Sequence, residues 1–476
     1  MKIYYCSSEA YPFSKTGGLA DVAAALPKTL NAHGHQVHIL IPLYKQNLSQ
    51  LYDFTFIKQH TFIINDTSYD VEYYQTSFDG TSYILIRNDK FFDRQKLYGY
   101  EDDDLRFSFF NYAILEFIRI NDQFIDIIHI NDWQTSLIPF LIDTTYKKLD
   151  PKFDTIKTLL TIHNLEKQGS FSLETEKYLG HKNFTYMHQD QVNFLKTGIM
   201  RANAINTVSE SYKNEILTRF YGFNLQGPLK SRQYQLYGIL NGFDESLYNP
   251  LTSSHLYKNY DENSFLNAKK VNKEKLLEKL GFKPDLDKPM IAFINRFARQ
   301  KGIDILMQII EKHLKNEECY LIILGQGDAL YESYFEELAH KYPHLVYDQN
   351  SFDLDLSQKV YAASDLFLLP SLFEPCGLNH MIAMKFGTLP IVRETGGLKD
   401  TVTPYNKFTG IGVGFTFKNN DASELSETIS TAFDLYHHHK DAFNEMIHLA
   451  MHVHHSMDKM ASQYESLYLK LIQNEI

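Results

Sequence analysis

The chain has 476 residues, of which 44% are hydrophobic and 22% charged, so it can bury more than one hydrophobic core. Its formal net charge of −11 argues against nucleic acid or an anionic membrane as the main partner. The three cysteines show neither metal-ligand spacing nor a pattern of pairs. The N-terminus turns polar too early for a signal peptide, and no apolar run approaches a membrane span. These features predict a globular cytoplasmic protein.

The first half of the chain alternates strand and helix patterns, as a doubly wound α/β domain does. Strands are predicted at 2–6, 37–41, 125–130, 158–162 and 204–208, and helices at 19–30, 105–120 and 189–202. Residues 53–87 alternate apolar and polar side chains, which predicts an antiparallel insertion.

The loop after the first strand contains Lys15, Gly17 and Gly18. Two glycines allow a backbone to approach a ligand closely, and a lysine supplies a point charge for a phosphate. Such a loop is often only the entry to a helix. The same TGGL segment recurs at 395–398, again between a strand and a helix, which favours a ligand site in each half.

Two polar residues follow predicted strands of the first half: Asp132 comes shortly after 125–130, and His163 directly after 158–162. Open α/β sheets bind ligands at the carboxyl ends of their strands. A lone histidine at a strand end is more often structural than catalytic. Its place at the same sheet edge as Lys15 and Asp132 favours a functional role.

The second half repeats the α/β rhythm after a turn at 241–244 and a polar stretch at 249–288, so a domain linker is predicted near 244–250. Strands are predicted at 289–294, 321–324 and 366–369, and helices at 302–314, from 328, from 377 and over 457–471. Arg296 and Lys301 follow the first of these strands, and a guanidinium fork with a point charge suits a diphosphate.

The stretch 365–402 combines a buried strand, Pro370, a loop carrying Glu374, and a helix opened by Gly377. Backbone N–H groups at a helix start favour an anion. A carboxylate just before such an anion-binding helix start predicts a ligand with a phosphate at one end, for the N–H groups, and hydroxyls at the other, for the carboxylate. A nucleotide-sugar fits that description.

The segment PSLFEPCGLNHMIAMKFGTLPIVRETGGLKDTV resembles the signature of bacterial glycogen and starch synthases, retaining glucosyltransferases of family 5 that use ADP-glucose. The segments SKTGGLADV, TIHNLEKQG, NGFD and NRFARQKG resemble the same family and occur in the same order. The resemblance therefore spans nearly the whole chain.

This resemblance implies a GT-B fold, in which two doubly wound, Rossmann-like domains face each other across a cleft. Residues 1–243 would form the N-terminal catalytic and glucan-acceptor domain, joined by a C-terminal helix, 457–476, that crosses back to it. Residues 244–456 would form the nucleotide-sugar domain. The implied reaction transfers glucose from ADP-glucose to the non-reducing end of an α-1,4-glucan such as glycogen, with retention and without a metal or other cofactor. Nothing in the sequence indicates the oligomeric state.

The resemblance also assigns site residues. The implied catalytic residues are Glu374, His163, Arg296 and Lys301. The implied substrate-binding residues are Lys15, Gly17, Gly18, Asp21, Asp132, Asn241, Phe352, Cys376, Gly377, Leu378, Thr395 and Gly396. Phe352 is expected to stack on the nucleobase.

The chain departs from the family pattern at three places. Asn131 stands where the family usually has His, and His380 where it usually has Gln. Glu166 and Lys167 lie where an aromatic residue is more usual. Because His380 replaces the usual Gln and acceptor-binding surfaces carry little sequence signature, another GT-B transferase that uses UDP-glucose or a small sugar acceptor is left open. A non-catalytic glucan-binding protein is disfavoured, because the predicted catalytic residues are all present.

Two patterns of potential metal ligands remain. DxD pairs occur at 102/104, 285/287 and 353/355, outside the predicted strand-end loops, and are interpreted as solvated carboxylates. His448, His452 and His455 share one helical face. Histidine spacing alone has low specificity, so a solvated face is predicted rather than a metal site.

Overall fold

A computed structural model describes residues 1–45, 53–121, 124–180, 185–351 and 353–476. The chain divides into two compact units. Unit 1 comprises Met1–Gly242 and Met457–Ile476, and unit 2 comprises Phe243–Ser456. The first boundary falls one residue before the predicted position, and the C-terminal segment of unit 1 begins at residue 457, where the helix crossing back was expected.

Unit 1 contains a nine-stranded sheet with the order β12-β11-β7-β6-β1-β2-β5-β4-β3. Its strands are β1 (Lys2–Cys6), β2 (Gln36–Pro42), β3 (Thr55–Ile64), β4 (Thr67–Phe78), β5 (Thr81–Arg87), β6 (Ile127–Asn131), β7 (Lys157–Ile162), β11 (Ala204–Thr207) and β12 (Leu236–Gly238). The β3–β4 and β4–β5 pairs are antiparallel, which confirms the predicted antiparallel insertion, and the other pairs are parallel. A small separate sheet joins β8 (Ser170–Phe171), β10 (Gln191–Asn193) and β9 (Met187–His188).

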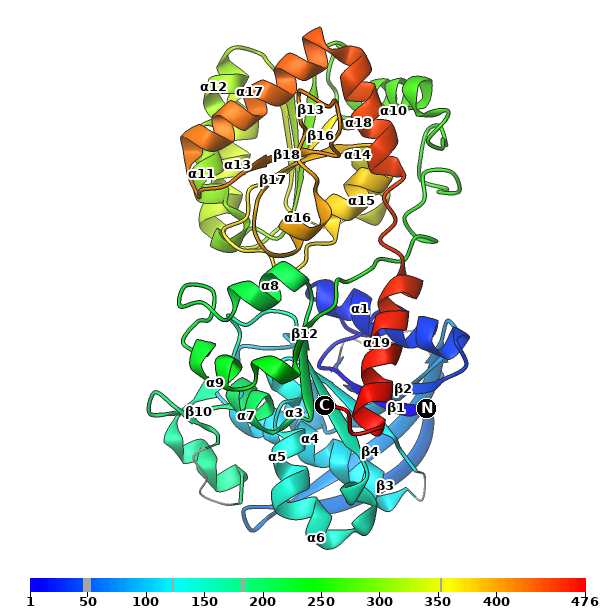
Figure 1. The fold of residues 1–476 in the computed structure, drawn as a ribbon, viewed down its shortest axis with the longest axis vertical. Helices are drawn as coiled ribbons and strands as arrows, with labels where there is room; N and C mark the ends of the chain where they lie inside the picture. The colour runs from blue at the N-terminus through cyan, green and yellow to red at the C-terminus, as the bar shows by residue number, and fades with distance from the viewer. Residues whose placement is uncertain (46–52, 122–123, 181–184, 352) are drawn as a thin grey trace. The chain divides into compact units, whose positions relative to one another are not determined.

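Helices cover both faces of the unit 1 sheet. They are α1 (Gly18–Ala32), α3 (Asp89–Phe92), α4 (Asp103–Ile120), α5 (Ile138–Leu141), α6 (Lys147–Leu149), α7 (Phe194–Arg201), α8 (Glu210–Glu215), α9 (Gln226–Ser231) and α19 (Met457–Ile472). The apolar stripes of α1 and α19 share one core, and the two helices lie side by side in Figure 1. The α4 helix belongs to a second core. The predicted C-terminal helix is therefore confirmed as part of the N-terminal unit.

Unit 2 contains a six-stranded, fully parallel sheet with the order β15-β14-β13-β16-β17-β18. Its strands are β13 (Met290–Ile294), β14 (Tyr320–Leu324), β15 (Val346–Gln349), β16 (Leu366–Leu369), β17 (Leu389–Arg393) and β18 (Phe415–Phe417). Its helices are α10 (Phe265–Lys279), α11 (Ile303–Met307), α12 (Ile310–Lys315), α13 (Ala329–Lys341), α14 (Leu354–Ala363), α15 (Asn379–Lys385), α16 (Gly396–Thr401), α17 (Ala422–His438) and α18 (Lys440–Met451). These helices lie on both sides of the sheet (Figure 1), as in a Rossmann-like domain.

Three helix predictions were wrong in detail. The helix expected at 302–314 is interrupted between α11 and α12, at Gln308 and the β-branched Ile309, a residue type that fits a helix less well. The helix expected at 189–202 begins only at Phe194, because residues 187–193 form a hairpin and Asn193 caps α7. The helix expected from Gly377 begins two residues later, at Asn379. None of the described helices is long and apolar enough to cross a membrane.

Candidate active site

The centre of the candidate site in unit 2 is a buried ion pair between Lys301 and Glu374. The Nζ atom of Lys301 lies 2.6 Å from Oε2 of Glu374, and the two side chains are 15% and 6% exposed. Ser371 donates a second hydrogen bond to the same oxygen at 2.9 Å. Because both side chains are largely buried, breaking this ion pair would be costly: each partner would be left as a buried charge without compensation.

Hydrogen bonds fasten the loop that carries Lys301 to the loop that carries Glu374. The Leu372 N–H donates to the Gln300 carbonyl at 2.8 Å, and the Gln300 side chain donates to the Phe373 carbonyl at 3.2 Å. Gly302 has φ = +71°, and a Cβ there would lie 1.9 Å from the Pro370 carbonyl oxygen. Glycine is therefore required for this close approach.

The second TGGL segment packs against the backbone of the Glu374 loop. A Cβ on Gly396 would lie 2.0 Å from the Glu374 carbonyl oxygen, and the Gly397 N–H donates to that oxygen at 3.1 Å. Thr395 and both glycines are buried. In the first TGGL segment, by contrast, Gly17 is exposed and a Cβ there would meet nothing within 4 Å. Two identical segments thus have different surroundings, and the first is the one open to a ligand.

The structure describes four further predicted residues of unit 2. Arg296 is exposed just after β13 and forms no hydrogen bond or ion pair with any described residue, so its guanidinium is available to an anion. Gly377 has φ = +78°, and a Cβ there would lie 3.0 Å from Cγ of Glu374. Cys376 is buried and Leu378 directly precedes α15. Phe352 lies outside the described residues.

In unit 1, Asp132 and His163 are brought together at the carboxyl edge of the sheet. The backbone N–H of His163 donates to Oδ1 of Asp132 at 2.7 Å. Asp132 has φ = +52°, a conformation that residues other than glycine rarely adopt and that clusters at functional sites. Burial raises the pKa of Asp132 to about 7 and lowers the pKa of His163 to about 3, so the imidazole is neutral at neutral pH.

The loop from Lys15 to Gly18 is organised by carboxylates. Lys15 Nζ lies 2.7 Å from Oδ1 of Asp21, and both side chains are about a third exposed. Oε2 of Glu9 accepts hydrogen bonds from the N–H and hydroxyl of Thr16, at 2.7 and 2.8 Å. Burial raises the pKa of Glu9 to about 7. The sequence analysis missed Glu9, whose only signal is its place in the loop after β1.

Asn241, the last predicted residue of unit 1, is buried after β12. Its Oδ1 atom has no hydrogen-bond partner among the described residues. A buried acceptor of this kind is rarely left unpaired in a native structure, which suits a residue that bonds to a ligand.

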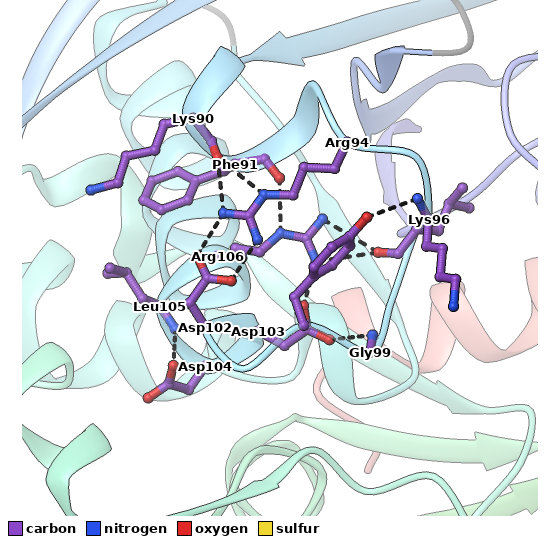
Figure 2. Close-up of polar contacts among 12 residues, drawn as sticks. Lys90, Phe91, Arg94, Lys96, Gly99, Asp102, Asp103, Asp104, Leu105 and Arg106 are labelled. Atoms are coloured by element: carbon purple, nitrogen blue, oxygen red, sulfur yellow. Dashed lines mark hydrogen bonds and ion pairs between the residues drawn. The ribbon is translucent and has the colours of Figure 1, made fainter.

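Tyr98 is a second residue that the sequence analysis missed. Its hydroxyl lies 2.7 Å from that of Ser8. Burial, and to a smaller extent the nearby Glu9 carboxylate, raises the pKa of the Tyr98 phenol well above its usual range. Figure 2 shows how the surrounding loop is fixed: Arg94 pairs with Asp102, and the buried Arg106 pairs with Asp103 and donates to the Phe91 carbonyl at 2.8 Å. These contacts hold the loop that carries Tyr98.

These contacts correct the interpretation of the 102/104 pair, whereas Asp285 and Asp287 are exposed, as predicted. Asp102 is not a freely solvated carboxylate, because its bonds to Arg94 hold its pKa below the usual range. Asp104 accepts a hydrogen bond from the Thr175 hydroxyl, and the Asp353 side chain caps the N-terminus of α14. His448 is half-buried, with Nδ1 3.1 Å from the Glu262 carbonyl oxygen, whereas His452 is exposed. Among the described residues, no group of three or more His, Cys, Asp or Glu side chains could hold a metal ion.

Comparison with known proteins places this arrangement in a family. A starch synthase catalytic domain model matches residues 2–231, and a glycosyl transferases group 1 model matches residues 273–445. The chain is 44% identical to a glycogen synthase of Acholeplasma laidlawii over the full length of both proteins. The chain belongs to the glycogen and starch synthase family. A glycogen synthase of Clostridium kluyveri is 42% identical over 99% of this chain and all of the relative.

Solved structures agree with this assignment. The catalytic domain of Arabidopsis thaliana starch synthase IV, bound to ADP and acarbose, is similar with a TM-score of 0.92 and 30% identity over 99% of both chains. A sucrose-phosphate synthase of Thermosynechococcus elongatus shares the fold, with a TM-score of 0.65 and 17% identity over 99% of both chains. The predicted family, the GT-B fold class and the glycosyltransferase class are confirmed. The roles of individual site residues stay predictions.

Proposed function

We propose that this glycogen synthase family member transfers glucose from ADP-glucose to the non-reducing end of an α-1,4-glucan, with retention of configuration, in the cytoplasm. The buried Lys301–Glu374 pair carries the proposal, because it joins a cation suited to a departing diphosphate to a carboxylate suited to a sugar. Membership of the family supports a nucleotide-sugar donor and a glucan acceptor.

The unit 2 residues supply the charge that the reaction needs. As the bond between the sugar and the diphosphate breaks, negative charge grows on the leaving phosphate and positive charge on the sugar ring. Arg296 and Lys301 offset the first, and the Glu374 carboxylate offsets the second. Both hydrogen bonds that described residues donate to the Glu374 carboxylate engage Oε2, so Oε1 is left to a hydroxyl of the bound glucose.

The unit 1 residues hold and orient the substrates. Gly17, Gly18 and Lys15 offer an open backbone and a cation to the donor phosphates, and Asp132 and His163 offer polar groups to sugar hydroxyls. ADP is favoured over UDP as the nucleotide because the starch synthase IV neighbour is bound to ADP.

The proposal is tested with radiolabelled donors and purified protein. ADP-[¹⁴C]glucose and UDP-[¹⁴C]glucose are each incubated with glycogen, with maltotriose, or with fructose or glucose as acceptor. We expect label from ADP-glucose to enter glycogen and maltotriose, at a rate at least about tenfold above that from UDP-glucose. Preferential transfer from UDP-glucose, or to a small sugar alone, would instead identify a different transferase of the same fold.

A further inference from the structure

Asn131, at the end of β6, is fully buried and its amide group can adopt only one orientation. One end of the amide lies 3.0 Å from the Cys6 carbonyl oxygen. A carbonyl oxygen only accepts hydrogen bonds, so the group facing it must be Nδ2. The backbone of Asn131 is held as well, because its N–H and carbonyl both bond to the Thr135 hydroxyl, at 2.8 and 2.9 Å.

The opposite end of the amide, Oδ1, therefore faces Tyr5 and His163. The Tyr5 hydroxyl donates to it at 3.0 Å, and burial raises the pKa of Tyr5 well above its usual range, so this donor keeps its proton. Nε2 of His163 lies 2.9 Å from the same oxygen. Since an amide oxygen has no hydrogen to give, Nε2 of His163 must carry the hydrogen.

The other ring nitrogen of His163 is then a bare acceptor. Burial keeps the imidazole neutral, and the only hydrogen bond of the ring to a described residue is the one made by Nε2. The titratable groups around the ring are Asp132, which accepts from the His163 backbone, the buried His129, and Tyr5. His163 as a whole residue is only half-buried, so part of it remains exposed.

We propose that Asn131 is a positioning residue, which holds His163 in the Nε2–H tautomer and so presents Nδ1 as a hydrogen-bond acceptor for a hydroxyl of the bound sugar. The identity of the ligand rests on the proposed function, whereas the tautomer does not. The resembled family usually has His at this position. A histidine there would titrate and could exchange its own tautomers, but an amide does neither, so the orientation of His163 stays the same across the neutral pH range.

The tautomer is measured directly by NMR of the ¹⁵N-histidine-labelled protein without substrate. The His163 signals are those missing from the spectrum of the His163→Gln variant. We expect a neutral ring with hydrogen on Nε2 throughout pH 6–8. Hydrogen on Nδ1, a mixture of tautomers, or an imidazolium at pH 7 would overturn the inference, whatever reaction the protein catalyses.

A variant series connects the tautomer to turnover. Asn131→Leu removes the acceptor, so the ring should populate both tautomers and kcat should fall about a hundredfold, as for other small misplacements of reacting groups. Asn131→Asp keeps an acceptor beside Nε2; it should restore the tautomer and part of kcat, and it should raise the pKa of His163 because a carboxylate stabilises the imidazolium.

Asn272→Leu is the matched control, since Asn272 is also fully buried and donates to two carbonyl oxygens, at 2.8 and 2.9 Å, but lies in α10 of unit 2. It should lower thermal stability while leaving the His163 tautomer unchanged and kcat within about twofold. An Nε2–H tautomer that persists in Asn131→Leu, or normal kcat despite mixed tautomers, would contradict the role of Asn131. A wild-type protein that shows the expected tautomer but transfers no glucose would contradict only the proposed function.

Discussion

Lys301 and Glu374 are 73 positions apart in the sequence, yet their charged atoms lie 2.6 Å apart. The cause is the order of the strands: Lys301 follows β13, Glu374 follows β16, and these two strands are parallel neighbours in the sheet. Because parallel neighbours end at the same edge, their following loops meet there. The topology of unit 2 thus builds the part of the site on which the proposed chemistry depends.

Replacing Glu374 by Gln should lower kcat by about 10²–10³-fold, because single electrostatic groups of this kind contribute roughly 3–4 kcal/mol to transition-state stabilisation. The amide keeps the shape of the side chain and an acceptor for Lys301, so the far-UV circular dichroism should not change. Steady-state transfer from ADP-glucose to glycogen measures the effect. Glu394→Gln is the control, since Glu394 bonds to Thr416 and has no predicted role. Near-normal turnover in Glu374→Gln would remove this residue from the site.

Gly302→Ala should damage the site more than Gly281→Ala. Both glycines have left-handed backbones, with φ of +71° and +82°, so both substitutions cost about 1 kcal/mol in backbone strain. Only at Gly302 would the new Cβ collide with another loop, at Pro370, whereas nothing lies within 4 Å at Gly281. We expect kcat to fall at least about tenfold in Gly302→Ala alone, because the Lys301 loop is displaced. Equal activities in the two variants would show that this close approach does not matter.

Continuous apolar runs were the part of the fold most easily predicted from the sequence. The strands expected at 2–6 and 366–369 coincide with β1 and β16, because strands buried on both faces leave a pattern that needs no knowledge of the neighbours. The hairpin before α7 was missed because its turn uses Gln189 and Asp190 at positive φ, without the glycine that marks such turns.

The site was predictable only as a set of residues and not as a set of contacts. The resemblance pointed to Lys301 and Glu374 separately, but their pairing depends on strand order. The two TGGL segments read alike, and only tertiary packing distinguishes the open Gly17 from the buried Gly396. Tyr98 reaches Ser8 across 90 positions, which no local pattern encodes.

The stability of unit 1 should decline as pH rises from 4 to 7, in part because of Asp132. Its pKa is raised from 3.8 to about 7 in the folded protein, so the folded state binds more protons than the unfolded state in that range. Each such group lowers the free energy of unfolding by about 1.4 kcal/mol for every pH unit of increase in that range. Asp132→Asn keeps the acceptor for the His163 N–H and should flatten the dependence. Urea unfolding followed by the fluorescence of Trp133, the single tryptophan, measures it.

Asp126→Asn provides the control for this pH dependence. Asp126 accepts a hydrogen bond from the Lys2 N–H at 2.7 Å, at the opposite end of the same sheet. Its replacement should leave the slope between pH 4 and 7 as it is in the wild type. An Asp132→Asn variant with the wild-type slope would show that the pKa of Asp132 is the same in the folded and unfolded protein.

Transfer should survive EDTA, because Arg296 and Lys301 supply positive charge for the leaving diphosphate. We expect the rate after dialysis against EDTA to stay within about twofold of the untreated rate, since cationic side chains can take this role. Replacing His448 and His452 by Gln should likewise leave transfer unchanged. Complete loss of activity in EDTA, restored by magnesium or manganese, would contradict this prediction.

The chemical form of the product tests the central claim most directly. Purified protein is incubated with ADP-glucose labelled with ¹³C at the anomeric carbon, with glycogen as acceptor, and the polymer is analysed by ¹³C NMR. The account predicts label in α-1,4 linkages at the non-reducing ends, released as maltose by an enzyme that cleaves only from those ends. Label confined to free glucose, in β linkages, or absent from the polymer would contradict it.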